Sequence, residues 1–190
     1  FYRDDGTPLI VPSIGAAVKQ VNLAAKGSTV IEAPNTGSLV QGYVAFSLPA
    51  GVRGYGVFRQ NVPNLPDQEA VVPLSDTTST TSTLTWDETK FVTGVAIVNP
   101  STVDATVTVT AWDETGKLIG TSSIPLPAGQ KAVNTLRSFA GLTGIAGHRG
   151  SARFTTTTGA VAVLGLRFLG TSFTSIPTTG EAATASQMKI

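Results

Sequence analysis

The sequence predicts an all-β protein built from two Ig-like antiparallel β-sandwich modules. Valine and threonine are abundant, and their β-branched side chains suit a pleated strand better than a helix. Twenty glycines and eleven prolines interrupt the chain at short intervals, as a fold with many tight turns requires. Segments of the first half also recur in the second half in the same order, which indicates two copies of one module.

Short segments of the second half alternate in the way that half-buried strands do. The clearest is Ala105 to Trp112, in which Val107, Val109 and Ala111 share one face and threonines occupy the other. One helical turn is expected within residues 134–140. The predicted strands, in chain order, are Leu84–Trp86, Phe91–Val98, Ala105–Trp112, Lys117–Ile124, Lys131–Val133, Gly150–Phe154, Ala160–Phe168 and Phe173–Ile176. Strands at intervals of about 8–12 residues are typical of a sandwich or barrel.

The internal repeat rests on four pairs of matching segments. They are Tyr2–Ile10 with Trp112–Ile119, Val21–Ala25 with Ile124–Ala128, Gly42–Phe46 with Gly150–Phe154, and Tyr55–Arg59 with Val163–Arg167. The stretch from Leu84 to Ala111 has no counterpart ahead of Phe1. We therefore expect the first module to lack its initial strands.

A sandwich without those strands would expose apolar side chains and strand edges. Each buried Val, Leu or Ile contributes roughly 1.5–3 kcal/mol, against a net domain stability of about 5–15 kcal/mol. Three sources for the absent strands stay open at this point. Upstream residues of the natural protein could supply them, the second module could merge with the first into one sandwich, or another copy could donate a strand.

The domain boundaries follow from the repeat and from composition. We predict an incomplete first module over residues 1–76, a Ser/Thr linker over 77–83, a second module over 84–180 and a loose tail over 181–190. The linker lies in a run of serine and threonine that contains no large apolar side chain. An exposed edge strand is the alternative for this run, because threonine is a good strand former.

Two groups of motifs resemble a known kind of repeat. Phe91–Ser101, together with Gly165–Phe168 and Phe173–Pro177, resembles motifs of an uncharacterised Ig-like β-sandwich repeat found in large secreted proteins of environmental bacteria. Val57–Gln60 with Pro66–Pro73 resembles a variant of that repeat. The resemblance covers nearly the whole chain. It implies an Ig-like module and an extracellular or cell-surface location, and it implies no catalytic residues.

Composition argues against several classes of function. The net charge is +1 and the basic residues are scattered, whereas nucleic-acid binding needs clustered Lys and Arg. No apolar run approaches the roughly 20 residues of a membrane helix. Without cysteine there is no disulfide, thiolate ligand or cysteine nucleophile. The single histidine, His148, cannot by itself make a zinc site, and no Gly-x-Ser-x-Gly elbow accompanies it. We expect His148 to be a solvated loop residue.

Three acidic pairs are the remaining candidates for glycosidase chemistry or calcium binding. They are Asp4–Asp5, Asp87–Glu88 and Asp113–Glu114. Each pair lies in a predicted turn, where an Asp side chain bonds its own backbone, so turn formation accounts for all three. Arg59 and Arg167 are expected either to pair with a carboxylate or to extend into water. We therefore predict no catalytic residue, no cofactor site and no metal site.

Trp86 and Trp112 are candidates for a sugar-stacking platform, with core packing as the favoured alternative. The sequence favours a non-catalytic structural or adhesive module of a secreted or surface-displayed bacterial protein, with β-strand complementation as a route to assembly. The alternative is a carbohydrate-binding module of a larger secreted protein. The expected partners are accordingly other copies of the chain, neighbouring modules of a longer chain, or a polysaccharide, with no nucleic acid and no membrane span.

Overall fold

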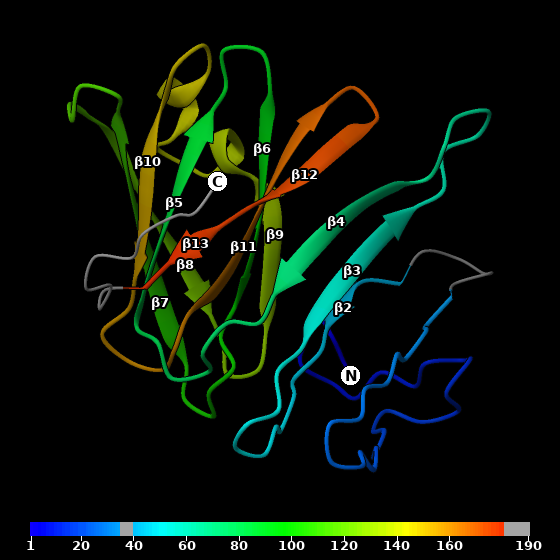
Figure 1. Cartoon of the computed structure of the whole chain (residues 1–190). Coiled ribbons are helices and arrows are strands. Elements are labelled where there is room, and N and C mark those ends of the chain that lie inside the picture. The colour runs from blue at the N-terminus through cyan, green and yellow to red at the C-terminus, as the bar shows by residue number, and fades with distance from the viewer. Residues whose placement is uncertain (35–39, 181–190) are drawn as a thin grey trace.

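The computed structural model of this chain describes residues 1–34 and 40–180, and this part is all-β. Two antiparallel sheets pack face to face between residues 81 and 179 (Figure 1). The predicted all-β class is confirmed, and the arrangement is consistent with a β-sandwich. Two single-turn 3-10 helices, η1 (Leu136–Ser138) and η2 (Thr143–Ile145), connect the sheets on one side.

The nine strands of the sandwich divide into a five-stranded and a four-stranded sheet. In spatial order the first contains β13 (Thr178–Thr179), β5 (Thr81–Asp87), β10 (Arg149–Thr155), β7 (Ala105–Asp113) and β8 (Leu118–Leu126). The second contains β12 (Ser172–Ile176), β11 (Ala162–Leu169), β6 (Val92–Val98) and β9 (Lys131–Thr135). Every pairing between neighbours in the two sheets is antiparallel.

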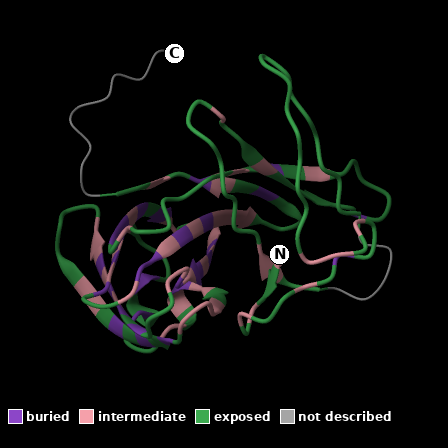
Figure 2. Ribbon diagram, turned by 90° about the horizontal axis from the view of Figure 1, so that it is seen from below, coloured by how far each residue is buried: buried purple, intermediate pink, exposed green. Residues whose placement is uncertain are grey.

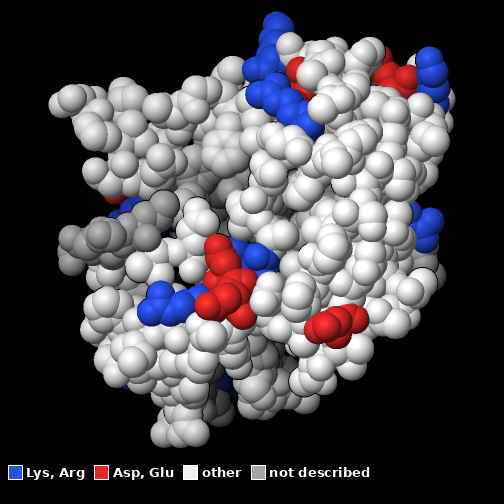
Figure 3. Space-filling model, turned by 180° about the vertical axis from the view of Figure 1, so that it is seen from behind, with Lys and Arg blue, Asp and Glu red and all other residues white. Residues whose placement is uncertain are grey.

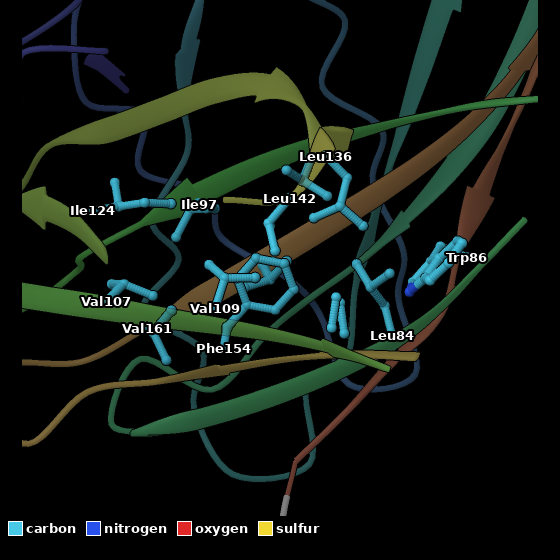
Figure 4. Packing of buried hydrophobic residues seen from close by; sticks show 14 of the residues in the cluster. Leu84, Trp86, Ile97, Val107, Val109, Ile124, Leu136, Leu142, Phe154 and Val161 are labelled. Carbon is cyan, nitrogen blue, oxygen red and sulfur yellow. The ribbon is translucent and has the colours of Figure 1, made fainter. Parts of the chain in front are cut away.

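The core lies between the two sheets and follows the alternation seen in the sequence. Val107, Val109 and Ala111 of β7 are fully buried, as their shared face predicts. Phe154 of β10 is also fully buried, and Figure 4 shows its ring among the side chains of both sheets. Trp86 is 3% exposed and closes one end of the cluster, which confirms core packing for this residue.

The predicted linker over residues 77–83 is wrong in its second half. Strand β5 begins at Thr81, and both Thr81 and Ser82 are buried. Their backbones pair with Thr155 and Phe154 of β10, which lies beside β5 inside the sheet. The segment has no large apolar residue, yet β-branched threonines tolerate an extended backbone and tertiary pairing supplies the rest. The predicted tail, residues 181–190, lies outside the described residues.

Residues 1–80 form two separate two-stranded sheets. One pairs β1 (Tyr2–Arg3) with β2 (Gly42–Tyr43), and the other is the hairpin of β3 (Tyr55–Gln60) and β4 (Gln68–Pro73). Neither joins the hydrogen-bonded sheets of the sandwich, so within the described part of the chain the two halves do not merge into one sandwich. Figure 2 shows these segments as mainly exposed, in contrast to the buried interior of the sandwich.

The β1–β2 sheet is fastened to the start of β9. The Asp4 carbonyl accepts a hydrogen bond from the Lys131 amide at 2.8 Å, and the Asp4 carboxylate lies 2.8 Å from the Lys131 ammonium. The same ammonium donates to the carbonyl of Gly42 at 2.7 Å. The Tyr43 hydroxyl donates to the carbonyl of Gly129 at 2.7 Å. The Lys131 side chain is only 9% exposed and that of Asp4 is 38% exposed, so this ion pair is partly shielded from solvent and helps to hold the two halves together.

Candidate interaction surface

The acidic pairs build turns, as the sequence predicts. In each turn one Asp oxygen accepts the backbone N–H of the threonine two residues later at 2.9 Å, and the threonine hydroxyl donates to the same oxygen. These acceptors are Asp5, Asp87 and Asp113. The hydrogen bond from the threonine hydroxyl is the largest cause that lowers the pKa of each carboxyl group. The carboxylates are therefore engaged in local structure.

The other acid of each pair has a basic neighbour instead of a second carboxylate. Asp4 pairs with Lys131, and the Glu114 carboxylate lies 3.4 Å from Arg149. Among the described residues, no group of three or more His, Asp or Glu side chains could hold a metal ion. A shallow depression bordered by Asp87, Asp113, Glu114 and Arg149 gathers some of these groups, but each has a turn or ion-pair role there.

Glu88 is the acid whose environment the sequence does not indicate. Its side chain is completely buried, and one carboxylate oxygen accepts the N–H of Thr93 at 2.9 Å. The other oxygen lies 3.4 Å from the guanidinium of Arg137, which is 42% exposed. The Glu88 backbone also bonds to Gly147 and His148. Glu88 thus joins β5, β6 and the loop after η2, and its role is structural.

The remaining singled-out polar residues also have local partners. His148 is exposed in its loop, as predicted, and its backbone bonds to Ile145 and Glu88. Arg59 pairs with Glu69 across the hairpin at 2.7 Å, so pairing with a carboxylate is confirmed for this arginine. Arg167 instead places its guanidinium 4.6 Å from the centre of the Phe91 ring, a cation–π contact.

The aromatic side chains outside the core do not form a flat row. Trp112 is half-buried beside a β-bulge in β7. Tyr2 and Tyr43 stack on each other with ring centres 5.1 Å apart and an interplanar angle of 16°. Stacking in this way covers one face of each ring, and the Tyr43 hydroxyl is already bonded to the sandwich. A sugar platform of parallel exposed rings is not formed by these residues.

Most of the exposed large apolar side chains lie within residues 1–74. Positions that align between similar sequence segments of the two halves differ strongly in exposure. Phe46 is 49% exposed, whereas its counterpart Phe154 is 0% exposed. Leu23 is 41% exposed against 2% for Leu126. The same kind of side chain therefore lies in a core in one half and in contact with solvent in the other, and exposed apolar patches of this kind mark interaction sites.

The exposed apolar surface is best defined on the β3–β4 hairpin. Tyr55 lies opposite Pro73, and Val57 opposite Val71. Side chains alternate between the two faces of a strand, so these four residues share one face, which we call the hairpin face. Tyr55 is 69% exposed, and Val57 and Val71 are each 52% exposed. The Arg59–Glu69 ion pair lies at one end of this face.

The opposite face of the hairpin is partly covered by the sandwich, with Phe58 still 47% exposed. The ring of Phe58 lies 5.3 Å from the ring of Phe173 on β12, and Ala70 is only 4% exposed. Figure 1 shows the hairpin leaning against the β12 side of the sandwich. This contact holds the hairpin in place and leaves the hairpin face directed away from the sandwich.

Local geometry is shared between aligned segments of the two halves. The amide of Arg3 donates to the carbonyl of Thr7 at 2.8 Å, and the amide of Asp113 donates to the carbonyl of Lys117 at 2.9 Å. The glycine within each turn has a φ of +83°. Type I turns followed by a left-handed glycine have this pattern, which the Asp-Gly and Thr-Gly signals indicate.

A second shared feature concerns two glycines in paired strands. Gly42 lies beside Tyr2 so closely that an added Cβ would be 2.1 Å from the Tyr2 carbonyl oxygen. Gly150 lies beside Trp112 in the same way, at 1.9 Å. The pairing registers also correspond, because Tyr2 faces the residue after Gly42 and Trp112 faces the residue after Gly150. Only glycine permits so close an approach of two backbones.

Comparison with known proteins does not supply an identity. The chain matches no family model, and no curated protein or solved structure is significantly similar to it. No helix in residues 1–34 and 40–180 is long and apolar enough to cross a membrane.

On the face shown in Figure 3 the charged side chains stand in a few small groups on a largely uncharged surface. The hairpin face was not singled out from the sequence, although the alternation of Tyr55 and Val57 was a signal for it.

Proposed function

We propose that the chain is a non-catalytic structural module of a secreted or surface-displayed protein, and that it joins other polypeptides through its exposed strands and apolar side chains. The observation that carries this proposal is the contrast in exposure between aligned positions, such as Phe46 and Phe154. Solvent contact of so many large apolar side chains is unfavourable, and a partner that covers them gains roughly 25 cal/mol per Å².

We infer that residues 1–76 and 84–180 are two copies of one Ig-like module. The matching turns at Gly6 and Gly116 support this inference, as does the matching close approach at Gly42 and Gly150. In the second copy the repeated strands enclose a core, while in the first they form two small sheets. Repetition of one module is common in structural and adhesive proteins, where stacked units set length and spacing.

Composition supports the extracellular setting. Charged residues make up 13% of the chain, about half of the roughly 25% that is typical, and no cysteine is present. Among the described residues, the acidic and basic side chains that were candidates for a catalytic or metal site take part in turns and ion pairs. The geometry therefore favours binding through the molecular surface.

Sedimentation velocity over a wide range of concentration tests the proposal. In the absence of a partner polypeptide, we expect the exposed apolar side chains to make the chain self-associate as its concentration rises, and to bind a dye that reports exposed apolar surface. A double variant, Val57→Lys with Val71→Lys, should weaken both effects. The matched control is Leu118→Lys, because Leu118 is 55% exposed on β8 of the sandwich and should leave them unchanged. A chain that stays monomeric and binds no dye would count against the proposed function.

A further inference from the structure

The hairpin of β3 and β4 corresponds to the hairpin of β11 and β12 in the sandwich. Arg59 and Arg167 occupy the same position in the aligned segments, which places Val57 at the position of Gly165. Gly165 belongs to the face of β11 that points into the core, where an added Cβ would contact Leu84 of the opposite sheet at 3.1 Å. The hairpin face is therefore the counterpart of a core-facing surface.

The exposure of neighbouring residues fits this correspondence. Val71 lies opposite Val57 on β4, as Ile176 lies opposite Gly165 on β12. Ile176 is 8% exposed, whereas Val71 is 52% exposed. Two residues earlier on the same face, Val163 of β11 is 4% exposed, whereas its counterpart Tyr55 is 69% exposed. The residues of β11 and β12 are thus buried in the sandwich, whereas their counterparts on the hairpin face are exposed.

The edge of β3 is open where the edge of β11 is paired. Strand β11 lies between β12 and β6, and its register with β6 sets Gly165 opposite Val95 and Val163 opposite Ile97. Strand β3 pairs with β4 alone among the strands of the described residues, so one row of its backbone N–H and C=O groups has no strand partner. An open edge beside an apolar face is a template for addition of a strand.

We propose that β3 accepts an antiparallel strand with the sequence pattern of β6, supplied by a partner polypeptide, and that apolar side chains of this strand cover the hairpin face. The register of β6 on β11 sets the register of the incoming strand on β3. The residue equivalent to Val95 lies opposite Val57, and the residue equivalent to Ile97 lies opposite Tyr55. This inference rests on the proposed function and names the chemistry of the partner.

The partner is a different polypeptide and not β6 of a second copy. In the sandwich β6 is an inner strand, bonded to β11 on one side and to β9 on the other. Val95 and Ile97 are 2% and 0% exposed in the core. A second copy would have to break its own sandwich to donate this strand, whereas a segment with the same alternation and no fixed partner binds without that cost.

A labelled peptide with the sequence of residues 90–100, titrated against the full chain, tests the proposal by fluorescence anisotropy. We expect saturable one-to-one binding and slowed hydrogen exchange at the backbone amides of Tyr55–Gln60. A peptide with Val95→Lys and Ile97→Lys should bind at least about tenfold more weakly. Two further peptides are N-methylated at alternate residues, one on the amides expected to face β3 and the other on the amides that face away from it. Only the first of these peptides should lose binding.

Variants of the chain provide the matched controls. Val57→Lys with Val71→Lys should weaken peptide binding by about tenfold or more, while Leu118→Lys should not change it. Thermal melts of each variant check that the sandwich remains folded. Absence of saturable binding, equal binding of both N-methylated peptides, or protection outside β3 would overturn the inference. If the peptide fails while the chain still forms oligomers that the hairpin variant disrupts, the strand pattern is wrong and the proposed function stands.

Discussion

Lys26 and Gly129 adopt the same left-handed backbone conformation, with φ of 63° and 71°, at the same position of two matching turns. In each turn the next amide donates to the carbonyl three residues earlier, at 2.8 and 3.1 Å. A residue with a Cβ pays roughly 1–2 kcal/mol in this conformation, whereas glycine does not. Gly129→Ala should therefore lower the free energy of unfolding of the sandwich by about 1–2 kcal/mol in urea denaturation.

The reverse change is expected to help the first turn. Lys26→Gly should slow hydrogen exchange of the Gly27 amide, because the left-handed conformation is then adopted without strain. Lys19→Gly is the control, since Lys19 is exposed and does not have a positive φ. Faster exchange at Gly27 in the Lys26→Gly variant would show that the turn is not limited by this residue.

Aligned phenylalanines should respond differently to truncation. Phe154→Ala opens a cavity in the closed core and is expected to cost about 3–5 kcal/mol. Phe46→Ala removes a half-exposed side chain and should cost less than about 1 kcal/mol. Equilibrium urea denaturation followed by the fluorescence of Trp86 and Trp112 measures both. Equal losses for the two variants would mean that Phe46 contributes to a packed core.

The buried carboxylate of Glu88 is expected to be needed for stability. Glu88→Ala leaves the N–H of Thr93 without its acceptor, and loss of a hydrogen bond to a charged group costs about 1.5–3 kcal/mol. Glu88→Gln keeps an oxygen for Thr93 and should lose less. Thermal unfolding of the three proteins gives the comparison. If Gln and Ala are equally destabilising, the ion pair with Arg137 and not the bond to Thr93 is the main contribution.

The turn between β7 and β8 provides a test that separates backbone strain from side-chain function. Gly116 has a φ of +83° and open space around its Cα, so Gly116→Val should destabilise the hairpin by strain alone, by roughly 1–2 kcal/mol. Asp113→Ala removes the bonds to the Thr115 amide and hydroxyl but should leave oligomer formation and peptide binding unchanged. Loss of either activity in that variant would make the acidic turn part of a binding site.

Acid should destabilise the chain through its turn carboxylates. The pKa values of Asp5, Asp76, Asp87 and Asp113 lie below the ordinary value near 3.8, chiefly because of threonine hydroxyl bonds. A lowered folded-state pKa means that the stabilisation is fully present above about pH 3.8 and is lost as the pH falls through the folded value. Melting temperatures measured between pH 2 and 6 should fall at the acid end. Asp113→Asn should reduce the size of that fall.

Much of the sandwich was predictable because its strands are amphipathic. The alternation of Val107, Val109 and Ala111 placed β7 and its buried face, and glycine marked the turn at Gly116. The first three residues of β5 were predicted as linker because Thr81, Ser82 and Thr83 include no apolar side chain, and pairing with β10 extends the strand through them. Burial of Glu88 was also missed, since the second residue of an acidic turn pair carries no sign of it.

The amino-acid sequence by itself determined most of the sandwich strands and the glycine turns, because each depends on the side chains of a few neighbouring residues. Which of the similar segments in the two halves enclose a core was decided only by tertiary structure. Phe154 and Ile176 are buried because two sheets close over them, whereas Phe46 and Val71 have similar side chains and remain exposed. Burial requires a second surface at the right distance, and that surface is supplied by long-range packing and not by the residue itself.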